Sequence, residues 1–431
     1  MQICLHMTVN PTWSPVDIKL EPAAEDYRTH VRALLQKELP VDWRGIAALD
    51  PDRRAQFNST WRAFLVEHSL IAPGWPSEYG GGGLDITSQS IVAEEFVRAG
   101  VPHQVLATDA LGLTLLGPTV LHYGTEAQKQ YFIPRTISAE IRWAQGYSEP
   151  EAGSDLFGLR TRAVRDGDEW VVNGSKIWQT AGAQANWIFA LVRTDPDAPK
   201  ARGLSFLLIP YDQPGVEVRP IKTMDGGAEL AEVFFDDTRT PLENIIGAPG
   251  DGAKVALTLL GFERGAGGIA AAAAAKLELL RLRDTMHSFG VADDLHLRRR
   301  LADCWTSVHV MHCLALRNLT VAASGRPPGA ESSITKLMMS EYRKRVTELA
   351  VDVLGPRALT PTGTPSLVDR GPQPLGMDAD SSSAWVADYL HARPGTVYGG
   401  SSEMQRNTIG EQVLGLPREP RPAPPTKAEM R

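Results

Sequence analysis

The stretch Tyr147-Ser148-Glu149-Pro150-Glu151-Ala152-Gly153-Ser154-Asp155 lies just after the point where the apolar spacing of the chain changes from helical to extended. Its small residues Ala152, Gly153 and Ser154 would let main-chain N–H groups approach a phosphate or a thioester-linked chain. Taken alone, the stretch is better explained as a glycine-rich turn that links a helix to a strand. Its surroundings decide between the two interpretations.

Before this stretch, apolar residues recur at intervals of three and four, which predicts helices from Glu21 to Glu140. After Arg142 the interval becomes two. This pattern predicts a series of short strands with no helices between them, which is typical of a small antiparallel barrel or sandwich. The strands are expected at 169–177, 187–192, 204–209, 216–221 and 232–235. Helical spacing resumes at Asp251.

The chain of 431 residues is too long for one small core. We therefore predict an α+β multidomain protein with an N-terminal helical domain (21–140), a central antiparallel β-barrel or sandwich domain (141–250) and a C-terminal four-helix bundle (251–416). The proline-rich tail 417–431 is expected to be disordered. The run Gly80–Gly83 is not followed by the Gly-Lys-Ser/Thr of a phosphate loop and is predicted to be a mobile loop.

The composition excludes several classes of protein. With 43% hydrophobic residues, 22% charged residues and a net charge of −7, the chain gives no reason to expect nucleic acid or an anionic membrane as a partner. It contains no apolar run long enough to span a bilayer and no signal-peptide pattern. Its three cysteines form no paired motif, and its histidines show no metal-ligand spacing. We expect a cytoplasmic protein without a metal site.

Two further stretches accompany the first one: Asn173-Gly174-Ser175-Lys176-Ile177-Trp178-Gln179-Thr180-Ala181-Gly182 and Tyr398-Gly399-Gly400-Ser401-Ser402-Glu403-Met404-Gln405-Arg406-Asn407. In this order and spacing, the three stretches resemble those of the acyl-CoA dehydrogenase family, and the resemblance extends from about Tyr27 to Pro417. It implies the same helical–β–helical order. It also implies an FAD cofactor held between the β-domain and the bundle, with help from a neighbouring subunit.

The resemblance also assigns the site residues. Cofactor contacts fall on Gln145, Tyr147, Ser148, Gly153, Ser154, Trp178, Thr180, Ser401 and Glu403, and substrate contacts on Ser154, Arg264, Tyr398 and Gly399. Glu149 and Asp155 are expected to shape the loop rather than to touch a ligand. An aromatic beside a hydrogen-bonding residue at a strand end suits a flavin ring, although Trp178 could also be an ordinary core tryptophan.

The catalytic base is the main departure from the family pattern. Oxidation of an acyl thioester between Cα and Cβ needs a base for the α-proton and an acceptor for the β-hydride. Many family members carry a glutamate directly after the tyrosine of the third stretch, but here Tyr398 is followed by Gly399. Another subset carries the base before an arginine on the first helix of the bundle, which makes Glu263, followed by Arg264, our candidate. Alternatively, Glu263 is a surface glutamate near a helix start.

The expected reaction converts an acyl-CoA to a trans-2-enoyl-CoA and passes the electrons to an external carrier such as an electron-transfer flavoprotein. A homodimer or tetramer is expected, and a heteromer is left open. Two other functions remain possible at this point. One is a flavin oxidase or monooxygenase of the same fold, and the other is a non-catalytic subunit of a heteromeric acyl-CoA dehydrogenase.

Overall fold

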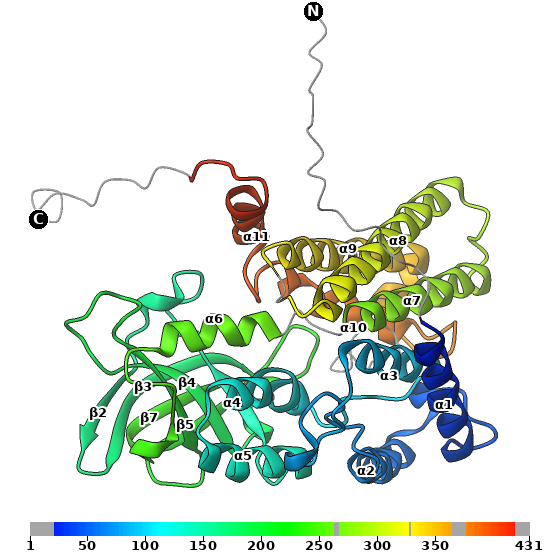
Figure 1. Cartoon of the computed structure of the whole chain (residues 1–431). Coiled ribbons are helices and arrows are strands. Elements are labelled where there is room, and N and C mark those ends of the chain that lie inside the picture. The colour runs from blue at the N-terminus through cyan, green and yellow to red at the C-terminus, as the bar shows by residue number, and fades with distance from the viewer. Residues whose placement is uncertain (1–20, 263–266, 327–328, 364–375, 419–431) are drawn as a thin grey trace, which may run out of the picture.

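The computed structural model describes residues 21–262, 267–326, 329–363 and 376–418. Figure 1 shows helices of the N-terminal third beside a β-domain, with a helical bundle stacked on the N-terminal helices. The helical–β–helical order and the fold class predicted from the apolar spacing are confirmed.

Among the N-terminal helices, α3 (Ile86–Ala99) and α5 (Glu126–Ser138) begin at residues whose side chains cap them. The side chain of Asp85 accepts hydrogen bonds from the backbone N–H groups at the start of α3, and Thr125 and Gln128 form a capping box at the start of α5. Trp61, Leu65 and Phe96 are buried where these helices meet. The helices are α1 (Pro22–Glu38), α2 (Pro51–Glu67), α3 (Ile86–Ala99), α4 (Gly117–Tyr123) and α5 (Glu126–Ser138).

The prediction of a mobile loop at Gly80–Gly83 is wrong. The backbone N–H groups of Gly81, Gly82 and Gly83 donate to carbonyls of the preceding turn, at Pro76, Ala72 and Trp75. A Cβ atom on Gly81 would lie 2.2 Å from the carbonyl oxygen of Trp75. The glycines are there because the backbone folds tightly against itself, a requirement that composition alone does not reveal.

The β-domain is one mixed sheet in which most neighbours are antiparallel. Its strand order is β6-β7-β3-β2-β4-β5-β8, and β1 pairs in parallel with β4. The strands are β1 (Trp143–Gly146), β2 (Arg162–Asp166), β3 (Glu169–Thr180), β4 (Trp187–Arg193), β5 (Leu204–Pro210), β6 (Val216–Ile221), β7 (Leu230–Pro241) and β8 (Ile245–Ile246). The five strands expected from the sequence are all present, and the short β1, β2 and β8 are additional.

The side chains of β4 alternate between two hydrophobic cores. Ile188, Ala190 and Val192 belong to the core inside the β-domain, whereas Phe189 and Leu191 belong to the core shared with the N-terminal helices. Both faces of this strand are therefore buried, which explains its continuous apolar sequence. The sheet and the N-terminal helices thereby form one packed unit.

The C-terminal helices divide between two places. Helix α6 (Gly252–Phe262) packs on β5 and α4, and its Val255 and Leu259 complete the core shared with the sheet. The remaining helices form the bundle around buried Leu279, Leu349 and Trp385. They are α7 (Gly268–Ser288), α8 (Leu295–Ala323), α9 (Ser332–Leu354) and α10 (Ser382–His391), followed by the short α11 (Ser402–Thr408), which projects from the bundle in Figure 1. Among the described residues, no helix is both long and apolar enough to cross a bilayer.

Candidate functional site

The first two sequence motifs lie side by side in the β-domain. The backbone N–H of Ile177, in β3, donates to the carbonyl of Ser148, in the loop after β1, at 3.0 Å. This bond aligns the loop that begins at Tyr147 with the strand that carries Trp178. Two stretches that the resemblance assigns to one ligand therefore lie next to each other in the fold.

A buried ion pair fixes this arrangement. The side chain of Lys176 is fully buried, and its Nζ lies 2.8 Å from Glu149 Oε1 and 3.2 Å from the carbonyl of Tyr147. The Glu149 carboxylate also accepts the backbone N–H groups of Arg160 and Thr161, at 2.6 and 2.9 Å. Glu149 therefore shapes the loop, as expected, and Lys176 anchors it to β3.

Lys176 is shielded from water more completely than its partner Glu149. Burial lowers the pKa of Lys176 to about 8, against the attraction of Glu149. Burial alone would raise the pKa of Glu149, but the charge of Lys176 and the hydrogen bonds to the carboxylate outweigh it, so this pKa lies below its ordinary value.

Glu149 should make the stability of the protein sensitive to acid. Because its pKa is lower in the folded protein than in the unfolded chain, its ionised form stabilises the fold above the ordinary pKa, and this contribution is lost as the pH falls. We predict that Glu149→Gln lowers the melting temperature at pH 7 and flattens its decline between about pH 5 and pH 3. Tryptophan fluorescence during heating measures both effects. An equally steep decline in the variant would contradict this role.

Trp178 is presented to solvent by an irregularity in β3. The pairing of β3 with β7 shifts register between Ile177 and Gln179, and Trp178 between them has a φ angle of +70°. A left-handed backbone is unfavourable for a large side chain and often marks a functional site. The indole is 55% exposed, so the interpretation of Trp178 as a core tryptophan is wrong. Its ring is available to pack on a planar ligand.

The remaining residues assigned in the first two motifs differ in exposure. Gly153, Ser154 and Thr180 are exposed, while Gln145 and Ser148 are half-buried. Tyr147 is an exception, because its ring is buried edge-on against Phe189 and Phe206 in the core. Any contact of Tyr147 with a ligand would therefore be made by its main chain.

The third motif forms a turn on the bundle. Tyr398 is 60% exposed, and the φ angles of Gly399 and Gly400 are +63° and +85°. Lys336 of α9 donates to the carbonyls of Gly395 and Gly400, at 3.1 and 2.7 Å. Two left-handed residues in succession favour glycine, so Gly399 serves the shape of the turn.

The two other residues predicted in this motif follow the turn. The Ser401 hydroxyl accepts the backbone N–H of Met404 and caps α11, and the Glu403 side chain is exposed in the first turn of that helix. The hydroxyl of Ser401 is therefore already engaged as an acceptor. It could still donate to a ligand.

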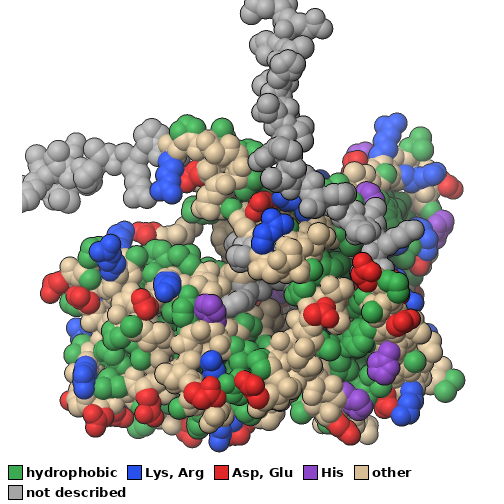
Figure 2. Space-filling model, viewed as in Figure 1, with side chains coloured by type: hydrophobic (Ala, Val, Ile, Leu, Met, Phe, Trp, Pro, Cys, Tyr) green, Lys and Arg blue, Asp and Glu red, His purple; other side chains and the backbone are tan. Residues whose placement is uncertain are grey.

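The predicted base Glu263 and the predicted substrate contact Arg264 lie outside the described residues. The helices on either side of them belong to different parts of the molecule, since α6 packs on the sheet and α7 packs in the bundle. In Figure 2, a gap in the molecular surface separates the β-domain from the segment that carries α11. The exposed Trp178 and Tyr398 belong to these two parts.

Several residues of the site were not found by sequence reasoning. Lys176 carries a signal in the sequence, because it stands an even number of residues after buried Trp170 and Val172 in the same strand. A lysine on the buried face of a strand needs a partner. Lys336, which holds the glycine turn, gave no signal because the carbonyls that it bonds are far away in sequence. Gln405 lies in the third stretch, and its bonds to the carbonyls of Gly399 and Gly400 follow from the shape of the turn, which the sequence does not show.

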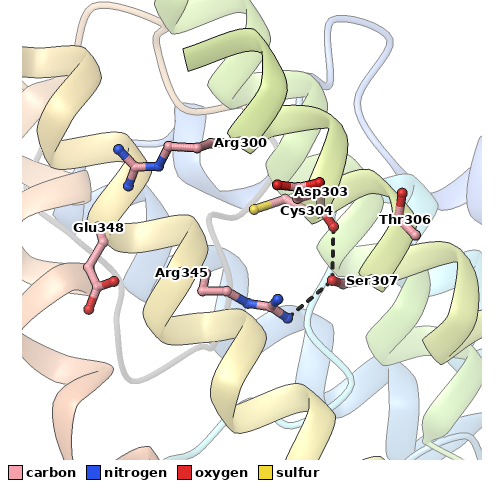
Figure 3. A pocket seen from close by; sticks show the side chains of 7 residues that line it. All are labelled: Arg300, Asp303, Cys304, Thr306, Ser307, Arg345 and Glu348. Carbon is pink, nitrogen blue, oxygen red and sulfur yellow. Dashed lines mark hydrogen bonds between the residues drawn. The ribbon is translucent and has the colours of Figure 1, made fainter. Parts of the chain in front are cut away.

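A separate hollow of about 450 Å³ lies between α8 and α9 (Figure 3). Three of its charged side chains have partners: Arg300 pairs with Asp352, Glu348 pairs with Arg393, and Arg345 donates to the Ser307 hydroxyl. Burial raises the pKa of the Cys304 thiol to about 11, so this thiol is not a nucleophile at neutral pH. None of the predicted site residues lines the hollow. In the described part of the chain, His, Cys, Asp and Glu side chains form no group that could hold a metal ion.

Comparison with family models matches each part of the chain. The model described as acyl-CoA dehydrogenase, N-terminal domain, matches residues 21–140. The middle-domain model matches residues 144–238, and the C-terminal-domain model matches residues 250–414.

Individual relatives cover nearly the whole chain. Acyl-CoA dehydrogenase IpdE1 of Mycobacterium tuberculosis is 38% identical over 399 residues, which covers 92% of this chain and 98% of that protein. Among solved structures, the Tcur3481-Tcur3483 steroid ACAD has a TM-score of 0.75 and 29% identity, covering 94% of this chain and 100% of that chain. A chain of the ChsE4-ChsE5 complex from Mycobacterium tuberculosis has a TM-score of 0.73 and 30% identity, with coverage of 94% and 100%.

Proposed function

Because the chain belongs to the acyl-CoA dehydrogenase family, a family of oxidoreductases, we propose that it binds FAD and oxidises an acyl-CoA between Cα and Cβ to a trans-2-enoyl-CoA. When bound, FAD would supply the acceptor for the hydride of the β-carbon. The protein would supply the base, the groups that orient the thioester and the walls that exclude water.

The observation that carries this proposal is the surface formed by the loop after β1 and the end of β3. Ser148 is bonded to Ile177, and the next residue, Trp178, exposes its ring on a strained backbone. The neighbouring Thr180 and the small residues Gly153 and Ser154 are exposed as well. A ring system beside a polar, phosphate-bearing chain is the kind of ligand that this combination fits.

We propose Glu263 as the base that takes the α-proton. Gly399 cannot accept a proton, so the carboxylate must come from elsewhere, and the sequence Glu263-Arg264 follows directly on α6. Because Gly399 and Gly400 have no side chains, they would leave room for the Glu263 side chain to reach the substrate from the opposite wall of the site. Tyr398, Gly399, Ser154 and Arg264 are the proposed substrate contacts, and an electron-transfer flavoprotein is the proposed electron acceptor.

The substrate class and the assembly belong to the same proposal. Two of the similar structures are named as pairs of proteins, and one of them is named a steroid ACAD. We therefore propose a heteromer as the alternative to a homo-oligomer, with a related chain as partner. A steroid-derived acyl thioester is accordingly the first bulky substrate to test beside straight-chain acyl-CoAs.

Reconstitution with FAD tests the proposal. The purified chain should become yellow, and a suitable acyl-CoA should bleach that colour in the absence of oxygen. Trp178→Ala should weaken FAD binding by about 2- to 10-fold, the range of a lost aromatic contact, while Trp178→Phe keeps most of the affinity. A wild-type protein that takes up no FAD would end the proposal. Bound FAD that no acyl-CoA bleaches in the lone chain, but that bleaches after co-purification with a related chain, would favour the heteromer.

A further inference from the structure

His391 joins the bundle to the β-domain. It is the last residue of α10, and its Nδ1 lies 3.3 Å from Asp225 Oδ2 and 3.5 Å from Glu229 Oε1. Both carboxylates belong to the loop between β6 and β7. The imidazole is 24% exposed and Asp225 only 6%, so the contact is largely sheltered from water.

On the β-domain side, the contact leads directly to the Trp178 end of β3. The carbonyl of Glu229 accepts the backbone N–H of Ala181 at 2.6 Å. Asp225 is held by the hydroxyl of Thr223 and by the backbone N–H of Gly227. The loop that contacts His391 is therefore hydrogen-bonded to the end of β3, close to the exposed ring of Trp178.

On the bundle side, the same contact leads to the glycine turn. Two residues after His391, Arg393 bonds to Glu348 and Thr347 of α9, at 2.6 and 2.9 Å. The segment that follows reaches Tyr398–Gly400, and the carbonyl of Gly400 accepts a hydrogen bond from Lys336 of the same helix. His391 thus lies on the connection between the two halves of the proposed site.

We propose that His391, Asp225 and Glu229 form a cross-domain latch that sets the spacing between Trp178 and the Tyr398–Gly400 turn, and with it the affinity for the cofactor. The inference rests on the proposed function, in which these two segments flank FAD. The imidazole Nδ1 lies within hydrogen-bonding distance of Asp225 Oδ2 and close to Glu229 Oε1, so one side chain of α10 contacts both carboxylates of the loop. His391 is a positioning residue, because it acts through the two segments and touches no reacting atom.

The test compares His391→Ala, Asp225→Asn and the double variant. In the protein without FAD, hydrogen exchange at 178–182 and 223–230 should become faster in His391→Ala. The dissociation constant for FAD, measured by flavin fluorescence, should rise roughly 3- to 30-fold, the range expected when two coupled residues are separated. The double variant should lose less than the two single variants together. His391→Arg, which places a hydrogen-bond donor and a cation opposite the two carboxylates, should recover part of the affinity.

The controls separate this inference from the proposed function. His287→Ala, an exposed histidine in the last turn of α7, should change neither measurement. Unchanged hydrogen exchange in His391→Ala, or an unchanged FAD affinity in all three latch variants, would overturn the latch. A wild-type protein that binds no FAD would instead refute the proposed function, and the exchange measurement would still decide whether His391 couples the two segments.

Discussion

Glu263→Gln should retain FAD and slow the bleaching of the flavin by acyl-CoA by about 10²- to 10⁴-fold, the usual contribution of a general base. Glutamine keeps the size of the side chain but cannot accept the α-proton at neutral pH. The proposed contacts to the cofactor lie on the loop after β1, on β3 and around the glycine turn, so the amide should not disturb FAD binding. Anaerobic stopped-flow absorbance measures the rate, and the absorbance ratio at 450 and 280 nm measures the bound FAD.

The matched control for this variant is Glu67→Gln, because Glu67 is an exposed glutamate at the end of α2. Its bleaching rate should equal that of the wild type. Equal rates in Glu263→Gln and in the wild type would remove Glu263 from the mechanism. A wild-type chain that binds FAD but is not bleached by any substrate would direct attention to a partner chain, since the base could then come from that chain.

The architecture could be predicted from the sequence because the spacing of apolar residues follows directly from which side chains are buried. Successive side chains of β4 enter two different cores, so its whole run is apolar, and intervals of three and four place Trp61 and Leu65 on the inner face of α2. The same rule found the five longer strands. It did not find β1, β2 and β8, which are short. Strands β1 and β8 pair with strands distant in sequence, whereas β2 pairs with β3 across an adjacent turn.

The site was less predictable, because its geometry depends on departures from regular structure. Periodicity cannot say that Trp178 takes a left-handed conformation, and the exposure of its ring follows from that conformation. Likewise, His391 and Asp225 are far apart in the sequence, and no local pattern pairs them. The resemblance to the family identified the stretches, and the structure supplied the contacts that hold them.

Lys176→Met should be the most destabilising of the substitutions considered. It leaves the Glu149 carboxylate, whose side chain is only 9% exposed, without its cation. Removal of one partner from a buried ion pair typically costs about 3–5 kcal/mol. The loss should appear as a lower melting temperature and as weaker FAD binding, since the pair anchors the loop from Tyr147 to Glu149 against the strand that carries Trp178.

The same loop provides a control of identical chemistry. Lys200 and Asp155 form a second lysine–carboxylate pair at 2.6 Å, but their side chains are 68% and 69% exposed. Lys200→Met should cost at most about 1 kcal/mol, because water screens an exposed pair. Adding Glu149→Gln to Lys176→Met should recover part of the lost stability, since it removes the uncompensated charge. Equal losses of stability in the two lysine variants would mean that the buried pair does not anchor the loop. A large loss in Lys176→Met that Glu149→Gln relieves would show that the unpaired carboxylate of Glu149 causes the effect.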